Sequence, residues 1–161
     1  MADVILIDIP DLAGTSQLAG YEGKIECLSY SHGVSMQVTS DVSNTERTSG
    51  RPMHQDFNLT KYIDKTTPML NQHCCEGKAF ATAKITIGRN DSGTVIPLIV
   101  YDLTNVVISS VSVGGGGGDK PVENFSLNYA SIKWDFSTQK EAGGKEGTVQ
   151  GKWDLSTNKA A

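Results

Sequence analysis

DFNLTKYIDKTTP, residues 56–68, is the segment of this 161-residue chain that says most about its fold. It begins with the alternation of bulky apolar and polar side chains that is typical of a strand, carried by Phe57, Leu59 and the Tyr62–Ile63 pair. It ends with a threonine and a proline, which together favour the start of a helix. The segment therefore predicts a strand that leads directly into a helix.

The predicted helix is short. Thr67 is a suitable N-cap, Pro68 stands at the first helical position, and Gly77 can end the helix in the left-handed conformation. These signals predict a helix of roughly ten residues, about 15 Å long. Four residues fall at helical spacing within it: Met69, Leu70, His73 and Cys74. No other stretch predicts a helix as clearly.

Strands are predicted over most of the remaining chain from their apolar patterns. They lie at about residues 4–9, 24–39, 83–88, 95–103, 106–113, 122–137 and 148–155. The sequence NDSG at 90–93 predicts a hairpin turn, and Pro97 predicts an edge position or a bulge. A shift in the phase of the alternation near residues 130–131 predicts a bulge or a change of packing surface.

These elements predict a mainly β fold. We expect one domain over residues 1–161, built as a β-barrel-like protomer or a sandwich of two packed sheets, with one short helix at its side. Several strands, including residues 4–9, are apolar on both faces. We therefore expect part of the surface to meet another subunit; the alternative is a closed barrel whose helix covers the excess apolar surface.

Two segments are candidates for a functional role. Alternation along the strand 24–39 sends Leu28 and Tyr30 toward the core and Ser29 and Ser31 to the opposite face. Residues 40–51 follow as a long polar loop, predicted to have no structure of its own, and such loops are usually functional or disordered. The loop residues taken as interface candidates are Ser40, Asp41, Asn44, Glu46, Arg47 and Arg51.

The composition excludes several kinds of partner. A net charge of −4, with scattered Lys and Arg, argues against nucleic acid, which needs a clustered basic surface. No apolar run approaches the roughly 20 residues that cross a membrane. The first ten residues lack a basic region and a small-residue cleavage site, so no cleaved export signal is predicted. The three cysteines, two of them adjacent, fit a reducing cytoplasm.

No metal site is predicted at His73-Cys74-Cys75, although His and Cys are the usual zinc ligands. Consecutive helical residues diverge by about 100°, so three in a row cannot converge on one ion. We expect Cys74 to face the core, with His73 and Cys75 as bystanders.

No catalytic or cofactor site is predicted either. A nucleophilic Cys27 or Cys75 with one of the histidines at 32, 54 or 73 lacks any supporting context. The glycine run at 114–118 is followed by Asp-Lys-Pro and a strand, whereas a phosphate-binding loop needs a hydroxyl and a helix. The carboxylates of Asp56, Asp64 and Asp102 lie on separate elements and suggest no paired acid and base.

Four ordered motifs resemble the haemolysin-coregulated protein (Hcp) family, whose members build the inner tube of type VI secretion systems. The motifs are FNLTKYIDKTTPML at 57–70, VISSVSVG at 107–114 with the glycine run, ENFSLNY at 123–129, and GKW at 151–153. The resemblance spans almost the whole chain, and residues 39–55 match least.

The resemblance implies a protomer similar to the tail-tube proteins of contractile phages, which assembles into hexameric rings. It implies that rings stack into a tube inside a contractile sheath and under a spike protein, and that the tube carries effector proteins into a target cell. Such a protein is cytoplasmic in the producing bacterium and is then secreted. In this picture Ser29 and Ser31 line the lumen, and the loop 40–51 makes ring-to-ring contacts.

Two other functions remain open on the sequence. One is a monomeric secreted effector or enzyme, whose mark would be a polar pocket with perturbed titratable groups. The other is a soluble carrier or chaperone for exported effectors. The same ring could have this role as well.

Overall fold

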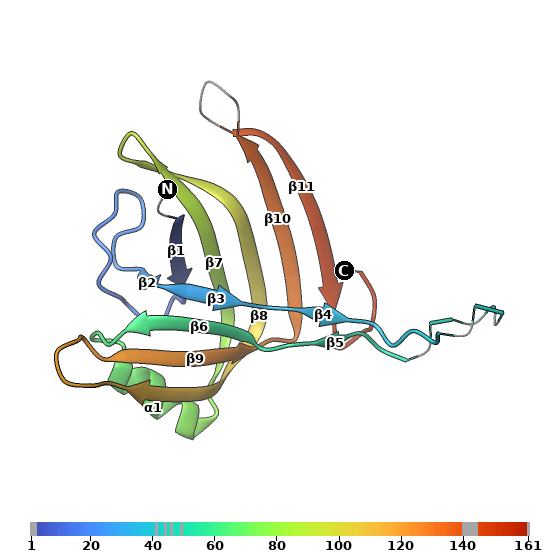
Figure 1. Cartoon of the computed structure of the whole chain (residues 1–161), viewed down its shortest axis with the longest axis horizontal. Helices are drawn as coiled ribbons and strands as arrows, with labels where there is room; N and C mark the ends of the chain where they lie inside the picture. Colours follow the sequence, from blue (N-terminus) through green and yellow to red (C-terminus); the bar gives the residue numbers. More distant parts are fainter. Residues whose placement is uncertain are drawn as a thin grey trace.

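The structure, a computed structural model, describes residues 3–40, 42–43, 45, 47–48, 50–139 and 145–160. This part of the chain is mainly β, with one short helix (Figure 1). In chain order the elements are β1 (Asp3–Asp8), β2 (Ile25–Cys27), β3 (Ser29–Ser31), β4 (Val34–Ser35), β5 (Met53–His54), β6 (Phe57–Tyr62), α1 (Thr67–Glu76), β7 (Ala79–Asp91), β8 (Thr94–Gly114), β9 (Val122–Asn128), β10 (Ser131–Gln139) and β11 (Lys145–Asp154).

The 21-residue strand β8 divides one continuous sheet into two halves. On one side it pairs with β7. On the other side its first part pairs with β10 and its second part, from Val107 onward, pairs with β9. Asn105 lies between these parts in a left-handed conformation with φ 51°, which asparagine tolerates better than most residues. The strand thus turns where it changes partner, and Figure 1 shows an upright half crossing a horizontal half.

The segment from β2 to β3 joins the two halves again. β2 pairs with β1 in the upright half, and β3 pairs with β6 in the horizontal half. Only Leu28 separates the two strands, and its N–H donates to the carbonyl oxygen of Thr60 at 2.6 Å. The strands therefore follow one another around a barrel, and β10 and β11 extend from β8 as a ribbon. The prediction of a mainly β, barrel-like protomer with one short helix is confirmed, and its two packed layers are the two halves of one continuous sheet.

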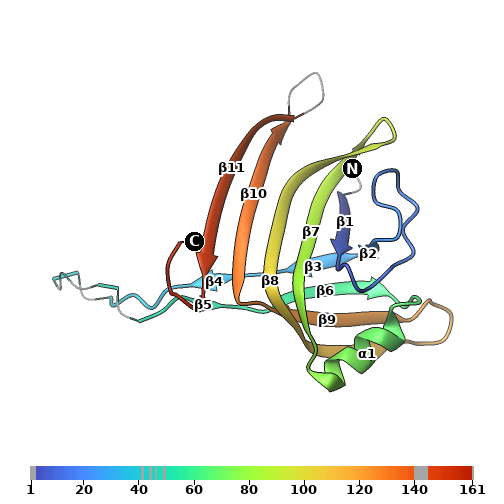
Figure 2. The ribbon, with the colours of Figure 1, turned by 180° about the vertical axis from the view of Figure 1, so that it is seen from behind.

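Helix α1 lies against the lower ends of β7 and β8, as Figure 2 shows from behind. Its buried side chains are Leu70 and His73, and the His73 ring meets Phe80 of β7 edge-on at 5.5 Å. Gly77 ends the helix with φ 63°, as predicted. The N-cap prediction was wrong by one residue: the cap is Thr66. Thr67 is already helical, and its hydroxyl donates to a carboxylate of Glu123 at 2.7 Å.

One core fills the space between the two halves. It takes Phe57 and Leu59 from β6, Phe125 and Leu127 from β9, and further apolar residues from β1, β7 and β8. Burying each such side chain contributes about 1.5–3 kcal/mol. Ile5, Leu6 and Ile7 are all buried, so a single chain covers both faces of β1. The two-faced pattern of that strand therefore does not by itself require another subunit.

Several strand boundaries differ from the prediction because strands change partners. The single strand expected at 24–39 is broken into β2, β3 and β4 where the chain passes from one half to the other. The strands expected at 95–103 and 106–113 are one strand, β8. The phase shift near residues 130–131 is confirmed as the break between β9 and β10.

The hairpin turn and the bulge were predicted correctly. Ser92 and Gly93 both have positive φ, at 50° and 86°, between β7 and β8. Ile87 pairs with Ile99 but Gly88 pairs with Pro97, so one residue is extra beside the proline. A Cβ on Gly88 would stand 2.7 Å from the Ile96 carbonyl oxygen, which explains the glycine at this bulge.

Candidate assembly surfaces

The horizontal half presents a polar face made of side chains that alternate with the core residues. The register places Ser29, Thr60, Asn124 and Ser112 in one row across β3, β6, β9 and β8. A second row consists of Ser31, Asn58, Ser126 and Ser110. These two rows, which contain no charged residue, are called the polar face below.

Hydrogen bonds within the polar face hold its side chains in place. The Thr60 hydroxyl donates to Oδ1 of Asn124 at 2.6 Å. The Ser126 hydroxyl lies 2.6 Å from the hydroxyls of both Ser109 and Ser110. The face is hollowed by a cavity of about 480 Å³ that both rows line. It can therefore offer neutral hydrogen-bonding groups to water or to a protein surface.

Ser29 and Ser31 both lie on the polar face and are exposed, so their predicted common orientation agrees with the structure. Tyr30 points to the other side, where its ring stacks on Phe57 at 6.0 Å. The prediction for Leu28 was wrong. Its side chain is 49% exposed, because the chain bends at this residue between β2 and β3.

The polar loop is part of a projecting hairpin, called the arm below and comprising residues 34–54. β4 and β5 pair at its root, and Val38 pairs with Thr48 farther out. The N–H of Thr39 donates to the carbonyl oxygen of Arg47 at 2.9 Å. Figure 1 shows the arm leaving the body in line with β3 and β6. The prediction that the loop has no structure of its own was therefore wrong where the hairpin pairing continues into it.

Of the six predicted interface residues of the loop, Ser40, Arg47 and Arg51 are described and exposed. The other three, Asp41, Asn44 and Glu46, lie outside the described residues. Sequence reasoning missed the apolar side chains of the arm. Those that are exposed are Val34, Met36, Val38, Val42 and Met53. The alternation VSMQV at 34–38 was the available signal.

A histidine on each side of the arm's root contacts the same tyrosine, which sequence reasoning also missed. Nδ1 of His54 lies 2.8 Å from the hydroxyl of Tyr129, and Nε2 of His32 lies 3.5 Å from it. The His32 ring also stacks on Phe57 at 5.1 Å. Burial lowers the pKa of both imidazoles. Neutral rings therefore fix the arm to the body, between β9 and the start of β6.

A buried ionic cluster joins β6, β9 and the start of α1. Nζ of Lys61 lies 2.8 Å from Oε2 of Glu123 and 3.0 Å from Oδ1 of Asp64, and the side chains of Lys61 and Glu123 are 0% exposed. Asp64 also accepts hydrogen bonds from the N–H and the hydroxyl of Thr66. Burial raises the pKa of Asp64, but these hydrogen bonds and Lys61 outweigh it, so the net pKa is lowered. The cluster fixes the helix to the barrel.

The predicted core position of Cys74 agrees with the structure, where Cys74 packs partly buried against the core. Cys75 is exposed. The description of His73 as a bystander was wrong, because its ring is buried against Phe80. Burial raises the pKa of the Cys27 thiol to about 12. Within the described ranges no three His, Cys, Asp or Glu side chains gather as metal ligands.

The described part of the chain contains no helix that is long and apolar enough to cross a membrane.

Solved structures define the class of protein to which this fold belongs. One described as a type six secretion system protein superposes with a TM-score of 0.92 at 25% identity, covering 99% of this chain and 100% of the other. Hcp1 from Salmonella typhimurium superposes with a TM-score of 0.81 at 21% identity over the full length of both chains. The fold is thus that of type VI secretion proteins.

Sequence comparison shows the family. Protein hcp1 of Pseudomonas aeruginosa is 41% identical over 106 residues, which is 65% of this chain and 65% of that protein. The match therefore leaves about a third of this relative's own length uncovered. The family described as "Type VI secretion system effector, Hcp" matches residues 6–136. The chain belongs to the Hcp family, as the four motifs predicted.

Proposed function

We propose that this protein is a structural subunit of the type VI secretion inner tube. Single chains, each folded as one domain over residues 1–161, assemble into hexameric rings, and rings stack into a tube. The tube lies inside a contractile sheath, carries a spike at its tip, and delivers effector proteins to a target cell. Membership of the Hcp family supports this proposal.

The polar face is the observation that carries the proposal. It covers four strands with small neutral side chains, while the opposite face of the same strands supplies core residues such as Phe57, Leu59, Phe125 and Leu127. A water-filled channel that must pass many different proteins needs a wall of this kind, because charges would bind some cargo tightly and repel other cargo. In this assignment Ser29 and Ser31 line the lumen.

Exposed apolar side chains on the upright half supply surface for contacts between neighbouring subunits in a ring. The register places Ile99, Phe136 and Val149 in one row across β8, β10 and β11. Phe136 is 41% exposed and Val149 is 71% exposed. Head-to-tail contacts between such surfaces generate a closed ring when the rotation between subunits closes. Each contact should bury on the order of 1,000 Å² or more.

The role is structural and not enzymatic in this proposal, with no cofactor and no nucleic-acid partner. The protein folds in the cytoplasm of the producing bacterium, where reduced thiols persist, and is then secreted. Export then depends on the secretion machine itself. A carrier function for effectors belongs to the same ring, since the lumen wall would be the surface that holds them.

Light scattering coupled to size exclusion tests the ring. At micromolar concentration we expect a mass of about six protomers, because contacts that each bury on the order of 1,000 Å² or more hold a ring together at that concentration. Negative-stain images should show rings with an open centre. A monomer over the same concentration range would overturn the proposal and favour the monomeric secreted effector or enzyme instead.

A further inference from the structure

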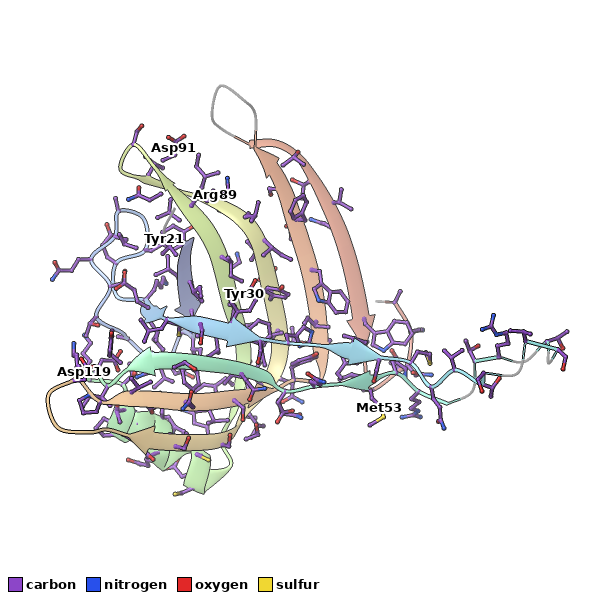
Figure 3. The ribbon with its side chains drawn as sticks, in the orientation of Figure 1. Tyr21, Tyr30, Met53, Arg89, Asp91 and Asp119 are labelled. Carbon is purple, nitrogen blue, oxygen red and sulfur yellow. The ribbon has the colours of Figure 1, made fainter. Side chains whose placement is uncertain are left out.

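The arm joins the barrel through two short connections that lie side by side. Residues 32–33 connect β3 to β4, and residues 55–56 connect β5 to β6. Figure 3 places Met53 at this root of the arm. The N–H of Gln55 donates to the carbonyl oxygen of Gly33 at 2.9 Å, so the two connections are tied to each other. The arm can therefore turn about them as one unit, as on a hinge.

A histidine stands at each connection, and both imidazoles enter one aromatic cluster. The His32 ring lies 5.1 Å from the Phe57 ring and 6.4 Å from the Trp134 ring. The His54 ring lies 6.2 Å from the Trp134 ring and 5.7 Å from the Tyr129 ring. The two imidazoles are 6.4 Å apart. Because His54 belongs to the arm and the other rings do not, this cluster is a docking contact between the arm and the barrel.

The contacts of the Tyr129 hydroxyl suit neutral imidazoles. Nδ1 of His54 lies 2.8 Å from this hydroxyl and Nε2 of His32 lies 3.5 Å from it. A neutral imidazole can accept the hydroxyl proton, whereas a charged imidazole has only donors. With both rings charged, the hydroxyl proton has no acceptor between them. An aromatic face attracts one cation, but two cations this close together in a partly buried cluster repel each other.

The titratable groups that face the two imidazoles are phenols. They are Tyr30 from β3, Tyr101 from β8 and Tyr129 after β9. Burial raises the pKa of Tyr101 to about 12 and also raises the pKa of Tyr129, so neither phenol ionises near neutral pH. Charged residues flank Tyr101 and Trp134 along their strands, but alternation sends them to the opposite face of the sheet: Asp102, Lys133 and Asp135.

The charged residues next to the root do not neutralise an imidazolium. The carboxylate of Asp56 is close enough to raise the pKa of Tyr129 further. Its two oxygens, however, accept hydrogen bonds from the Ser109 hydroxyl at 2.7 Å and from the Asn128 amide at 2.8 Å. Arg51 is exposed and would only repel a second cation. The ion pairs found among the described residues include neither of the two histidines of the root.

We propose that His32 and His54 form a pH-sensitive hinge, which holds the arm against the barrel while both imidazoles are neutral and releases it in mild acid. Release is a property of the single chain. Its consequence for assembly rests on the proposed tube, in which the loop 40–51 makes the ring-to-ring contacts. Acid should then separate stacked rings without unfolding the barrel.

The direction of the pH dependence follows from the docked state. Burial lowers the pKa of both imidazoles; the charge of His54 lowers the pKa of His32 further, and the backbone of Gln55 opposes this in part. Docking is therefore fully favoured above the ordinary imidazole pKa of about 6.5, and weakens as pH falls below it toward the lowered values. Because two protons bind on release, the docking equilibrium should weaken by up to about 100-fold per pH unit.

Fluorescence anisotropy of a probe on the arm tests the hinge. We would attach the probe at Val42→Cys, in a chain whose own cysteines are replaced by Cys27→Ser, Cys74→Ala and Cys75→Ser. Anisotropy should fall between pH 7 and about pH 5, because a released arm rotates more freely than the barrel. The same probe at Gln72→Cys, on the exposed face of α1, should show no such change. Constant anisotropy of the arm over this range would overturn the hinge.

Amides that copy the hydrogen-bonding nitrogens remove the titration. His32→Gln replaces Nε2 and His54→Asn replaces Nδ1, and the double variant should keep the arm docked at both pH values. His73→Gln, the matched control at the third histidine of the chain, should keep the wild-type response. If the double variant is already released at pH 7, the single variants decide: each should halve the steepness of the transition. A wild-type response in both single variants, or in a docked double variant, would refute the proposal.

Electron microscopy of tubes tests the consequence for stacking. Wild-type tubes should separate into rings at about pH 5, while tubes of the double variant, or of a single variant in part, should persist. Wild-type tubes that keep their length would show that the hinge does not control stacking. If tubes form at no pH, the proposed tube has failed, and the anisotropy of the arm still decides whether the hinge exists.

Discussion

Lys61 occupies a position where the alternation of β6 requires an apolar side chain. Phe57, Leu59 and Lys61 all point to the core, and the lysine is as completely buried as the other two. Taking an ammonium and a carboxylate out of water costs several kcal/mol for each ion, so Lys61 is tolerated only because Glu123 and Asp64 meet it. Removal of one partner costs more than the pair contributes.

Asp64→Asn should make the free energy of unfolding less dependent on pH in the acid range. The pKa of Asp64 is lowered in the folded state, so its carboxylate stabilises the fold above its unfolded pKa of about 4, and this contribution is lost as pH falls through the folded value. We expect the variant to lose about 1–3 kcal/mol at pH 7 in urea unfolding. Below pH 4 its stability should approach that of the wild type.

Asp119→Asn, on the exposed connection after β8, is the matched control and should change little at either pH. If the stability lost in Asp64→Asn is the same at pH 7 and pH 3, this role of the carboxylate is contradicted. A loss that came from packing alone would not change with pH.

Ser31→Arg tests the lumen assignment of the polar face. Six copies of the added cation would narrow the proposed pore and make it strongly positive. Rings should still form, since Ser31 is exposed and its hydroxyl is not needed by the core. Capture of effector proteins, measured by co-purification with the ring, should be lost.

Two variants control for side-chain loss and for added charge elsewhere. Ser31→Ala should keep cargo, and so should Gln72→Arg on the exposed face of α1. If Ser31→Arg rings hold effectors as well as wild-type rings do, Ser31 does not face the lumen.

At the scale of elements, the arm can be removed without harm to the barrel. Replacing residues 40–51 with a short Gly-Ser turn keeps the pairing of Val34 with His54 and of Ser35 with Met53. Closure entropy varies slowly with loop length, so folding and ring formation should persist. Tube formation and secretion, followed by electron microscopy and by immunoblot of culture medium, should be abolished.

A second variant replaces residues 40–51 with a Gly-Ser segment of the same length. It keeps the length of the loop and removes its side chains, so the two contributions can be separated. We expect it to fail as the short turn does, because it lacks Val42, Arg47 and Arg51. Normal secretion by either variant would show that the loop has a role other than ring stacking.

Local signals predicted the elements that depend on near neighbours. The helix ended at Gly77, the turn formed at Ser92 and Gly93, and the bulge appeared beside Pro97, since each rests on backbone conformations set within a few residues. The orientation of Ser29 and Ser31 followed from simple alternation.

Contacts between distant segments could not be predicted in the same way. Nothing near Lys61 shows that Glu123, 62 positions away, will meet it, so Tyr62 and Ile63 were expected to carry the apolar pattern instead. Tyr62 is in fact 44% exposed. Leu28 was misplaced for a related reason: the bend at this residue exists only because β2 and β3 pair with different halves of the barrel.

At the scale of the whole molecule, β8 belongs to both halves of the sheet, so neither half is complete without it. We therefore expect the described halves to unfold together. Fluorescence of Trp134 and Trp153 reports on β10 and β11, whereas far-UV circular dichroism reports on all strands. In urea the two signals should give coincident transitions, as cooperative single domains do.

The measurement should be repeated at two protein concentrations, since ring dissociation makes the midpoint depend on concentration. Both signals should then move together. A fluorescence transition that precedes the circular dichroism transition at each concentration would show that the β10–β11 ribbon melts on its own, against the single-domain proposal.

The buried pair of Lys61 and Glu123 also has a consequence for how the chain finds its strand alignment. A shift of β6 against β9 by one residue would point Phe57 and Leu59 toward solvent, so burial of apolar side chains disfavours this register. A slip by two residues keeps every apolar side chain inside and escapes that penalty. It would, however, set Lys61 opposite Phe125 or Pro121 and separate two charges in the core. The ion pair thus rejects misalignments that hydrophobicity alone would accept.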